Sequence, residues 1–133
     1  MVFHPIGTSR RVILSYDRLC RLAGLRLVCV NRPGRFGTDL PSGSDLPKHR
    51  AFVDTFCADV AAVLQALLVG RVSILAVSTG APFAWAFATK YPQYCTGRVL
   101  GLSCWVAKQV RLPYRHVFLF LLVHRTVSFL RVS

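Results

Sequence analysis

The sequence contains no glutamate, and its five acidic residues, all aspartates, stand against 17 lysines and arginines. The resulting net charge of +12 is compatible with attraction to nucleic acid or to anionic lipid. The basic residues are scattered, however, and no dense Lys/Arg block or aromatic-interleaved RNA motif is present. We therefore expect no nucleic-acid partner, and expect most arginines to line ordinary solvated faces.

Several other common signals are also missing. No C-x-x-C pair occurs, so we expect neither a zinc site nor redox chemistry, and no cofactor. The start has no basic region followed by an apolar run, and no segment reaches the ~18 apolar residues of a spanning helix. These absences predict a cytoplasmic protein with reduced thiols in its core. The five cysteines are Cys20, Cys29, Cys57, Cys95 and Cys104.

The most informative stretch is residues 72–83, which predicts a buried strand, a sharp turn and the start of a helix. Ser78 lies at the corner, and the small Gly80 allows a helix to leave the turn close to the strand. Pro82 suits the first helical turn, where its missing N–H costs nothing. The pattern A-x-S-x-G, with Ala76 in the first small position, is typical of a nucleophile elbow. The alternative is a strand-to-helix turn that happens to contain serine.

Hydrophobic periodicity predicts one α/β domain in which strands and helices alternate. Alternation of this kind indicates parallel strands joined by right-handed crossovers. A helix cap is expected at Thr8 or Ser9 and helix ends at Gly24 and Gly70. The expected strands comprise residues 1–3, 25–30, 72–77 and 98–106, and the expected helices comprise residues 10–23, 51–69 and 80–90.

Five short motifs resemble, in their sequence order, those of the α/β-hydrolase fold family. They are the HPIGTSRR loop at residues 4–11, the NRPGRFGT loop at residues 31–38, the elbow at Ser78, Tyr91-Pro92 at a helix end, and a sixth-strand segment at residues 97–105. Together they resemble a fungal hydrolase-like group with N-P-I-G-T-S-R-R and N-R-P-G loops. The likeness covers residues 1–106, and Asn31 stands where the family commonly has aspartate.

The resemblance implies an α/β fold: a truncated, hydrolase-like parallel sheet of about four strands flanked by helices. By family numbering the strand order would be fourth, third, fifth, sixth. It also implies that Ser78 is the nucleophile and that the backbone N–H groups of Ile6 and Thr79 form the oxyanion hole. His4 would shape the adjoining loop. Pro5 replaces the usual glycine, so that position has no N–H to donate.

A catalytic acid and base are not recognisable. Serine hydrolysis needs a base and an orienting acid, which in this family follow the nucleophile along the chain. No Asp or Glu follows Ser78, since the last acidic residue is Asp59. His116 and His124 do follow, but neither matches the family's histidine motif, and both read as helix or surface residues. We expect a serine esterase or lipase class protein, acting on a small-molecule ester if active, with impaired catalysis.

Two functional alternatives remain open: a non-catalytic interaction protein, and a basic peripheral membrane protein. The division expected is a partial hydrolase core at residues 1–110 and an apolar basic tail at residues 111–133. As a helix the tail would dock on the sheet domain as the start of a cap, or lie on a membrane surface. A third reading is that the tail is not native coding sequence. Unpaired sheet edges lead us to expect self-association.

Overall fold

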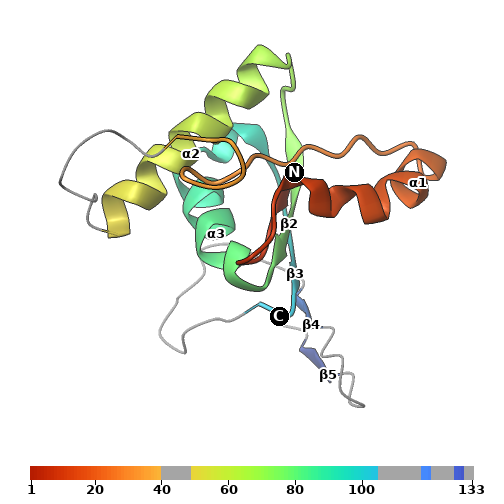
Figure 1. Ribbon diagram of the computed structural model, residues 1–133. Helices are drawn as coiled ribbons and strands as arrows, with labels where there is room; N and C mark the ends of the chain where they lie inside the picture. Colours follow the sequence, from red (N-terminus) through yellow and green to blue (C-terminus); the bar gives the residue numbers. More distant parts are fainter. Residues whose placement is uncertain (40–48, 105–117, 121–127, 131–133) are drawn as a thin grey trace.

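A parallel sheet forms the centre of the structure (Figure 1). Its strands are β1 (Val2–Phe3), β2 (Val72–Val77) and β3 (Cys95–Leu102), hydrogen-bonded in the order β1-β2-β3. The computed structural model describes residues 1–39, 49–104, 118–120 and 128–130. The sheet confirms the expected α/β class, and β2 has the bounds that the sequence predicted.

The strand expected at residues 25–30 is replaced by a single bridge. Cys29 pairs with Val2 in parallel, and the Val2 N–H donates to the Val28 carbonyl at 2.8 Å. This segment lies beside β1, on the side away from β2, so the expected order of segments is kept. Because β1 is only two residues long, it offers too little backbone for a longer ladder. The expectation of about four strands is corrected to three strands and one bridge.

Helices lie on both sides of the sheet (Figure 1), but only those on one side bury residues against it. The helices α2 (His49–Ala66) and α3 (Ala81–Lys90) lie on one side, and α1 (Leu14–Leu22) lies on the other. A 3-10 turn, η1 (Arg10–Ile13), precedes α1, and the Ser9 hydroxyl caps it by accepting from the Arg11 N–H at 3.2 Å. The chain reverses after α1 at Gly24, whose φ of 66° is in the left-handed region.

The core lies between the sheet and the pair α2 and α3. Phe56 of α2 meets Phe3 edge-on at 6.2 Å between ring centroids, and Phe87 of α3 lies 5.8 Å from Phe3. The middle of the apolar stripe predicted along residues 51–69 is buried here, as expected from its spacing of three and four, whereas Leu67 and Leu68 at its end are exposed. The helix ends at Ala66 rather than near Gly70, and Leu68 then takes a left-handed φ of 54°.

By contrast, α1 buries none of its nine residues, although its sequence has a helical apolar stripe. Leu14, Leu19 and Leu22 are each more than 60% exposed. Within the described residues, no helix is long and apolar enough to cross a bilayer.

The tail differs from the expected helix wherever the structure describes it. Strands β4 (Phe118–Phe120) and β5 (Ser128–Leu130) form an antiparallel pair, with Leu119 opposite Phe129. Aromatic and branched apolar residues suit a strand as well as a helix, so an apolar run without clear periodicity does not decide between them. The rest of residues 111–133, and the boundary expected at residue 110, lie outside the described residues.

Gly80 allows the start of α3 to touch the end of β1. A β-carbon built on Gly80 would lie 2.7 Å from the carbonyl carbon of Phe3, and closer still to its oxygen. The φ of Gly80 is −72°, so the position needs a small residue because of space alone. Glycine at this corner therefore sets how closely the β2–α3 turn approaches the loop that begins at His4.

Replacing Gly80 with alanine should destabilise the protein by about 3 kcal/mol, because backbone on both sides must move apart. Urea unfolding of the variant measures this loss. The matched control is Gly70→Ala, since Gly70 is exposed and an added β-carbon there has no atom within 4 Å. Equal stability of the two variants would contradict the close contact.

Candidate active site

Ser78 is the first residue after β2 and opens a 3-10 turn, η2 (Ser78–Gly80), that leads directly into α3. Its φ of 48° is in the left-handed region, which non-glycine residues rarely adopt. The residue before it, Val77, is still extended, and Pro82 lies in the first turn of α3. The backbone thus turns sharply at Ser78, as in a strained strand-to-helix elbow. The serine is partly buried.

The surroundings of the Ser78 side chain contain no activating base among the side chains that the structure describes, residues 1–39 and 51–104. No hydrogen bond there joins its hydroxyl to a histidine or a carboxylate. His116 and His124 lie outside the described residues. Behind the elbow, the Cys104 thiol donates to the Ala76 carbonyl at 3.2 Å, which ties the end of β3 to β2.

The two residues expected to supply the oxyanion hole lie together, but one donor is already engaged. The Ile6 N–H donates to the Thr79 side-chain hydroxyl, Oγ1, at 2.7 Å. A substrate oxyanion would therefore have to displace this hydroxyl before Ile6 could donate to it. The sequence could not reveal this contact, because it joins residues 73 positions apart.

The loop after β1 is held through the carbonyl oxygen of Pro5. The Arg32 guanidinium donates to this oxygen at 2.8 Å, the Thr8 hydroxyl donates at 2.9 Å, and the His4 Nδ1 lies at 3.0 Å. Arg32 also lies over the Phe83 ring, 5.2 Å from its centroid, which stabilises the cation further. This role of Arg32 was not predicted from the sequence. The available signal was its place in the NRPG loop, at the same sheet edge as the HPIG loop.

His4 is only 2% exposed, and its Nε2 has no partner among the described residues. Burial lowers the pKa of His4 because a charged imidazole would lose its hydration. The Pro5 carbonyl opposes this shift, whereas the positive charge of Arg32 adds to it. The ring is therefore neutral at physiological pH. Its contacts attach it to the loop that it was expected to shape.

The buried cysteines are poor candidates for an alternative nucleophile. All five are free thiols, as expected, and Cys57, Cys95 and Cys104 are buried. Burial raises the pKa of Cys57 to about 11, so this thiol is not ionised at neutral pH. Within the part of the chain that the structure describes, no three His, Cys, Asp or Glu residues gather as a metal site.

No family model and no curated protein matches the chain. Among solved structures, the chain is similar to a hydrolase from Pseudomonas aeruginosa PA01, with a TM-score of 0.62 and 21% sequence identity. The match covers 80% of this chain and 38% of that hydrolase, so the chain spans well under half of its length. At this identity the likeness establishes the fold: a mixed α/β arrangement whose parallel sheet and flanking helices match those of a hydrolase.

The lowered pKa of His4 gives a prediction about stability and pH. As pH falls below the ordinary value of 6.5, the unfolded chain takes up a proton at His4 while the folded chain does not. The contribution of His4 to stability is therefore complete above pH 6.5 and is lost as pH falls toward the lowered folded-state pKa. Urea unfolding between about pH 8 and pH 5 measures this loss. The variant His4→Gln should show a shallower decline, and an identical decline would contradict the assignment.

Proposed function

We propose that this chain carries the nucleophile side of a serine hydrolase site of the esterase or lipase class, and that its catalysis is impaired. One observation carries the proposal: Ser78 has a left-handed φ at the corner between β2 and α3. Such a corner presents a side chain at the carboxyl end of a parallel strand, where α/β enzymes bind ligands. The similarity of fold to a hydrolase is consistent with this reading.

In the proposed reaction, the Ser78 hydroxyl oxygen attacks the carbonyl carbon of a small ester, and negative charge develops on the carbonyl oxygen. The N–H groups of Thr79 and Ile6 are the donors proposed to stabilise that charge. The ester C–O bond breaks, and the proton lost by Ser78 passes through water to the leaving alkoxide. Water then hydrolyses the acyl-serine, which releases the carboxylic acid and restores the Ser78 hydroxyl. Backbone donors need no titrating group, so this half of the site is independent of an acid or base.

We propose impaired catalysis because the groups that would activate Ser78 are not recognisable. A serine hydroxyl is a weak nucleophile until a base removes its proton, and an acid must hold that base in place. Every aspartate in residues 1–133 precedes Ser78, so none of these residues stands in the family's position for the acid, after the nucleophile. The hydroxyl of Thr79 adds a second obstacle, since it accepts from the N–H of Ile6.

An external base should reveal the nucleophile. In buffer alone, we expect the chain to hydrolyse p-nitrophenyl acetate no faster than its Ser78→Ala variant. With imidazole added, the unmodified chain should exceed the variant, because imidazole supplies the missing base. Strong Ser78-dependent turnover without imidazole would contradict the impairment. The absence of any Ser78-dependent increment, with or without imidazole, would contradict the role of Ser78.

Removing the hydroxyl of Thr79 should release the N–H of Ile6. The variant Thr79→Val keeps the shape of the side chain, and its Ser78-dependent rate in imidazole should rise about tenfold, less than the 10²–10³ that one complete oxyanion donor supplies. Thr79→Ser is the matched control, since it retains a hydroxyl and should stay near the unmodified rate. If valine and serine variants react equally, the hydroxyl does not obstruct the hole.

A further inference from the structure

A hollow of about 310 Å³ lies beside the loops that hold the candidate active site. Ser9, Arg10 and Arg11 form one wall, and Asn31 and Phe36 form the other. The first wall follows β1, and the second follows the bridge at Cys29, so both come after neighbouring strand positions at the carboxyl edge of the sheet. Its volume is at the lower end of the range for small-molecule pockets, roughly 300–1,000 Å³.

Asn31 joins the two walls. Its side chain is 5% exposed, and both ends of its amide are engaged. The Oδ1 atom accepts from the Arg10 N–H at 2.6 Å, and the Nδ2 group donates to the Phe36 carbonyl at 3.2 Å. An aspartate could accept the first bond but could not donate the second, and it would add a negative charge. The Asn31 amide therefore links the two walls of the hollow. Because the amide is neutral, it does not reduce the positive charge of the arginines there.

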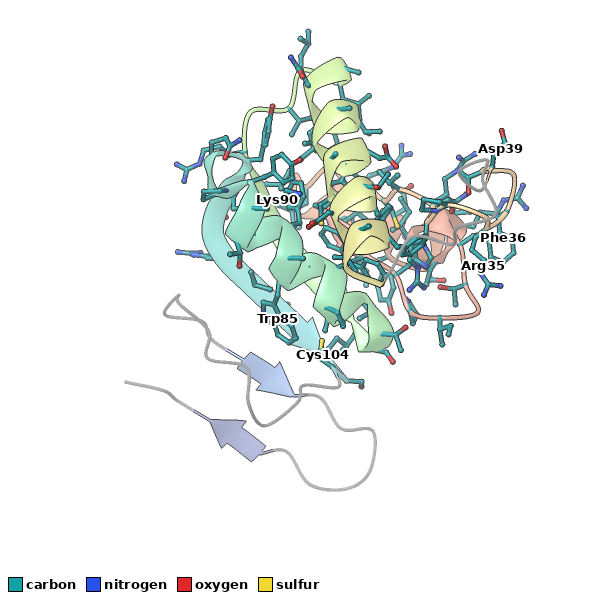
Figure 2. All side chains as sticks on the ribbon, turned by 90° about the vertical axis from the view of Figure 1, so that its left-hand side faces the viewer. Arg35, Phe36, Asp39, Trp85, Lys90 and Cys104 are labelled. Carbon is teal, nitrogen blue, oxygen red and sulfur yellow. The ribbon has the colours of Figure 1, made fainter. Side chains whose placement is uncertain are left out.

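Hydrogen bonds of Thr38 support the loop that carries Phe36. The Thr38 hydroxyl lies 2.8 Å from the Arg32 carbonyl and 2.7 Å from the Arg35 carbonyl, and accepts from the Arg35 N–H at 3.1 Å. Phe36 has a left-handed φ of 49° and is 61% exposed. Figure 2 shows Arg35, Phe36 and Asp39 on this one loop. The bonds of Thr38 fix the backbone near Phe36, and the exposed Phe36 ring offers an apolar surface to the hollow.

The charge of the hollow is unbalanced. Among the described residues, no hydrogen bond or ion pair engages the guanidinium group of Arg10 or Arg11. Neither Asp17 nor Asp39 pairs with these two arginines. Asp17 accepts from Arg21 at 2.8 Å, and Asp39 forms no ion pair within the same set of residues. Cations gathered without a counter-charge repel one another, and a bound anion relieves that repulsion.

We propose that this hollow binds a small organic anion. Its carboxylate or phosphate group lies between the guanidinium groups of Arg10 and Arg11, which suit the planar, paired donation that such oxyanions accept. Its apolar part lies on Phe36. The Ser9 hydroxyl accepts from the N–H of Arg11 through its oxygen and so keeps its own proton to donate to the ligand. Binding does not involve Ser78, so this site stands or falls separately from the hydrolase proposal.

Titration of the full chain with phenyl phosphate, benzoate and the neutral benzamide, followed by NMR or calorimetry, tests the site. We expect both anions to bind and benzamide not to bind. The double variant Arg10→Gln/Arg11→Gln should weaken anion binding at least about tenfold, the loss expected for charge-assisted contacts. The matched control is Arg18→Gln/Arg26→Gln, which removes the same charge from exposed positions outside the hollow. Melting temperatures establish that each variant is folded.

A third variant tests the apolar wall. Phe36→Ala keeps a side chain at the same φ and should weaken phenyl phosphate and benzoate while leaving inorganic phosphate unchanged. Whichever of phenyl phosphate and benzoate binds more tightly identifies the anionic group that the site prefers. Equal weakening by the two arginine double variants would mean that diffuse charge alone attracts the anion, and would overturn the proposal. Binding of benzamide as tight as that of benzoate, or no anion binding at about 10 mM, would overturn it as well.

Discussion

The contact between Gly80 and the end of β1 is the constraint on which the candidate active site depends. It brings the β2–α3 turn against the Phe3 carbonyl, with no room for a side chain at position 80. Because Thr79 directly precedes this glycine, its hydroxyl is carried to the N–H of Ile6. A looser corner would move the turn away from the loop. The two proposed oxyanion donors, the N–H groups of Ile6 and Thr79, would then lie farther apart.

Two polar groups hold the loops beside that corner. The Pro5 carbonyl gathers Arg32, Thr8 and His4, and the Asn31 amide joins Arg10 to Phe36. Loops cannot bury enough apolar surface to hold a single conformation, so hydrogen bonds from side chains give them their shape. As Arg32 follows Asn31 in the chain, the loop of the candidate active site and the hollow proposed to bind an anion share one support.

Local patterns predicted local elements well. The spacing of apolar residues predicted α2, and the unbroken apolar run predicted β2, since both signals are contained within the element itself. The strand expected at residues 25–30 was wrong, and the tail differs from the expected helix at residues 118–120 and 128–130. Strand pairing depends on how much backbone the neighbour offers, and β1 offers only two residues. An apolar run in the tail fits the period of a helix or of a strand. The segment that it pairs with decides its conformation, as the pairing of β4 with β5 shows.

The sequence by itself determined the class of fold, the position of Ser78 at a turn, and the order in which every acidic residue precedes that serine. These follow from composition and from neighbours along the chain. Only the tertiary structure decided that Thr79 engages the N–H of Ile6, that Arg32 holds Pro5, and that Asn31 joins the walls of the hollow. Those bonds join residues 73, 27 and 21 positions apart. A parallel sheet brings such residues together because its strands lie side by side and their carboxyl ends meet at one edge.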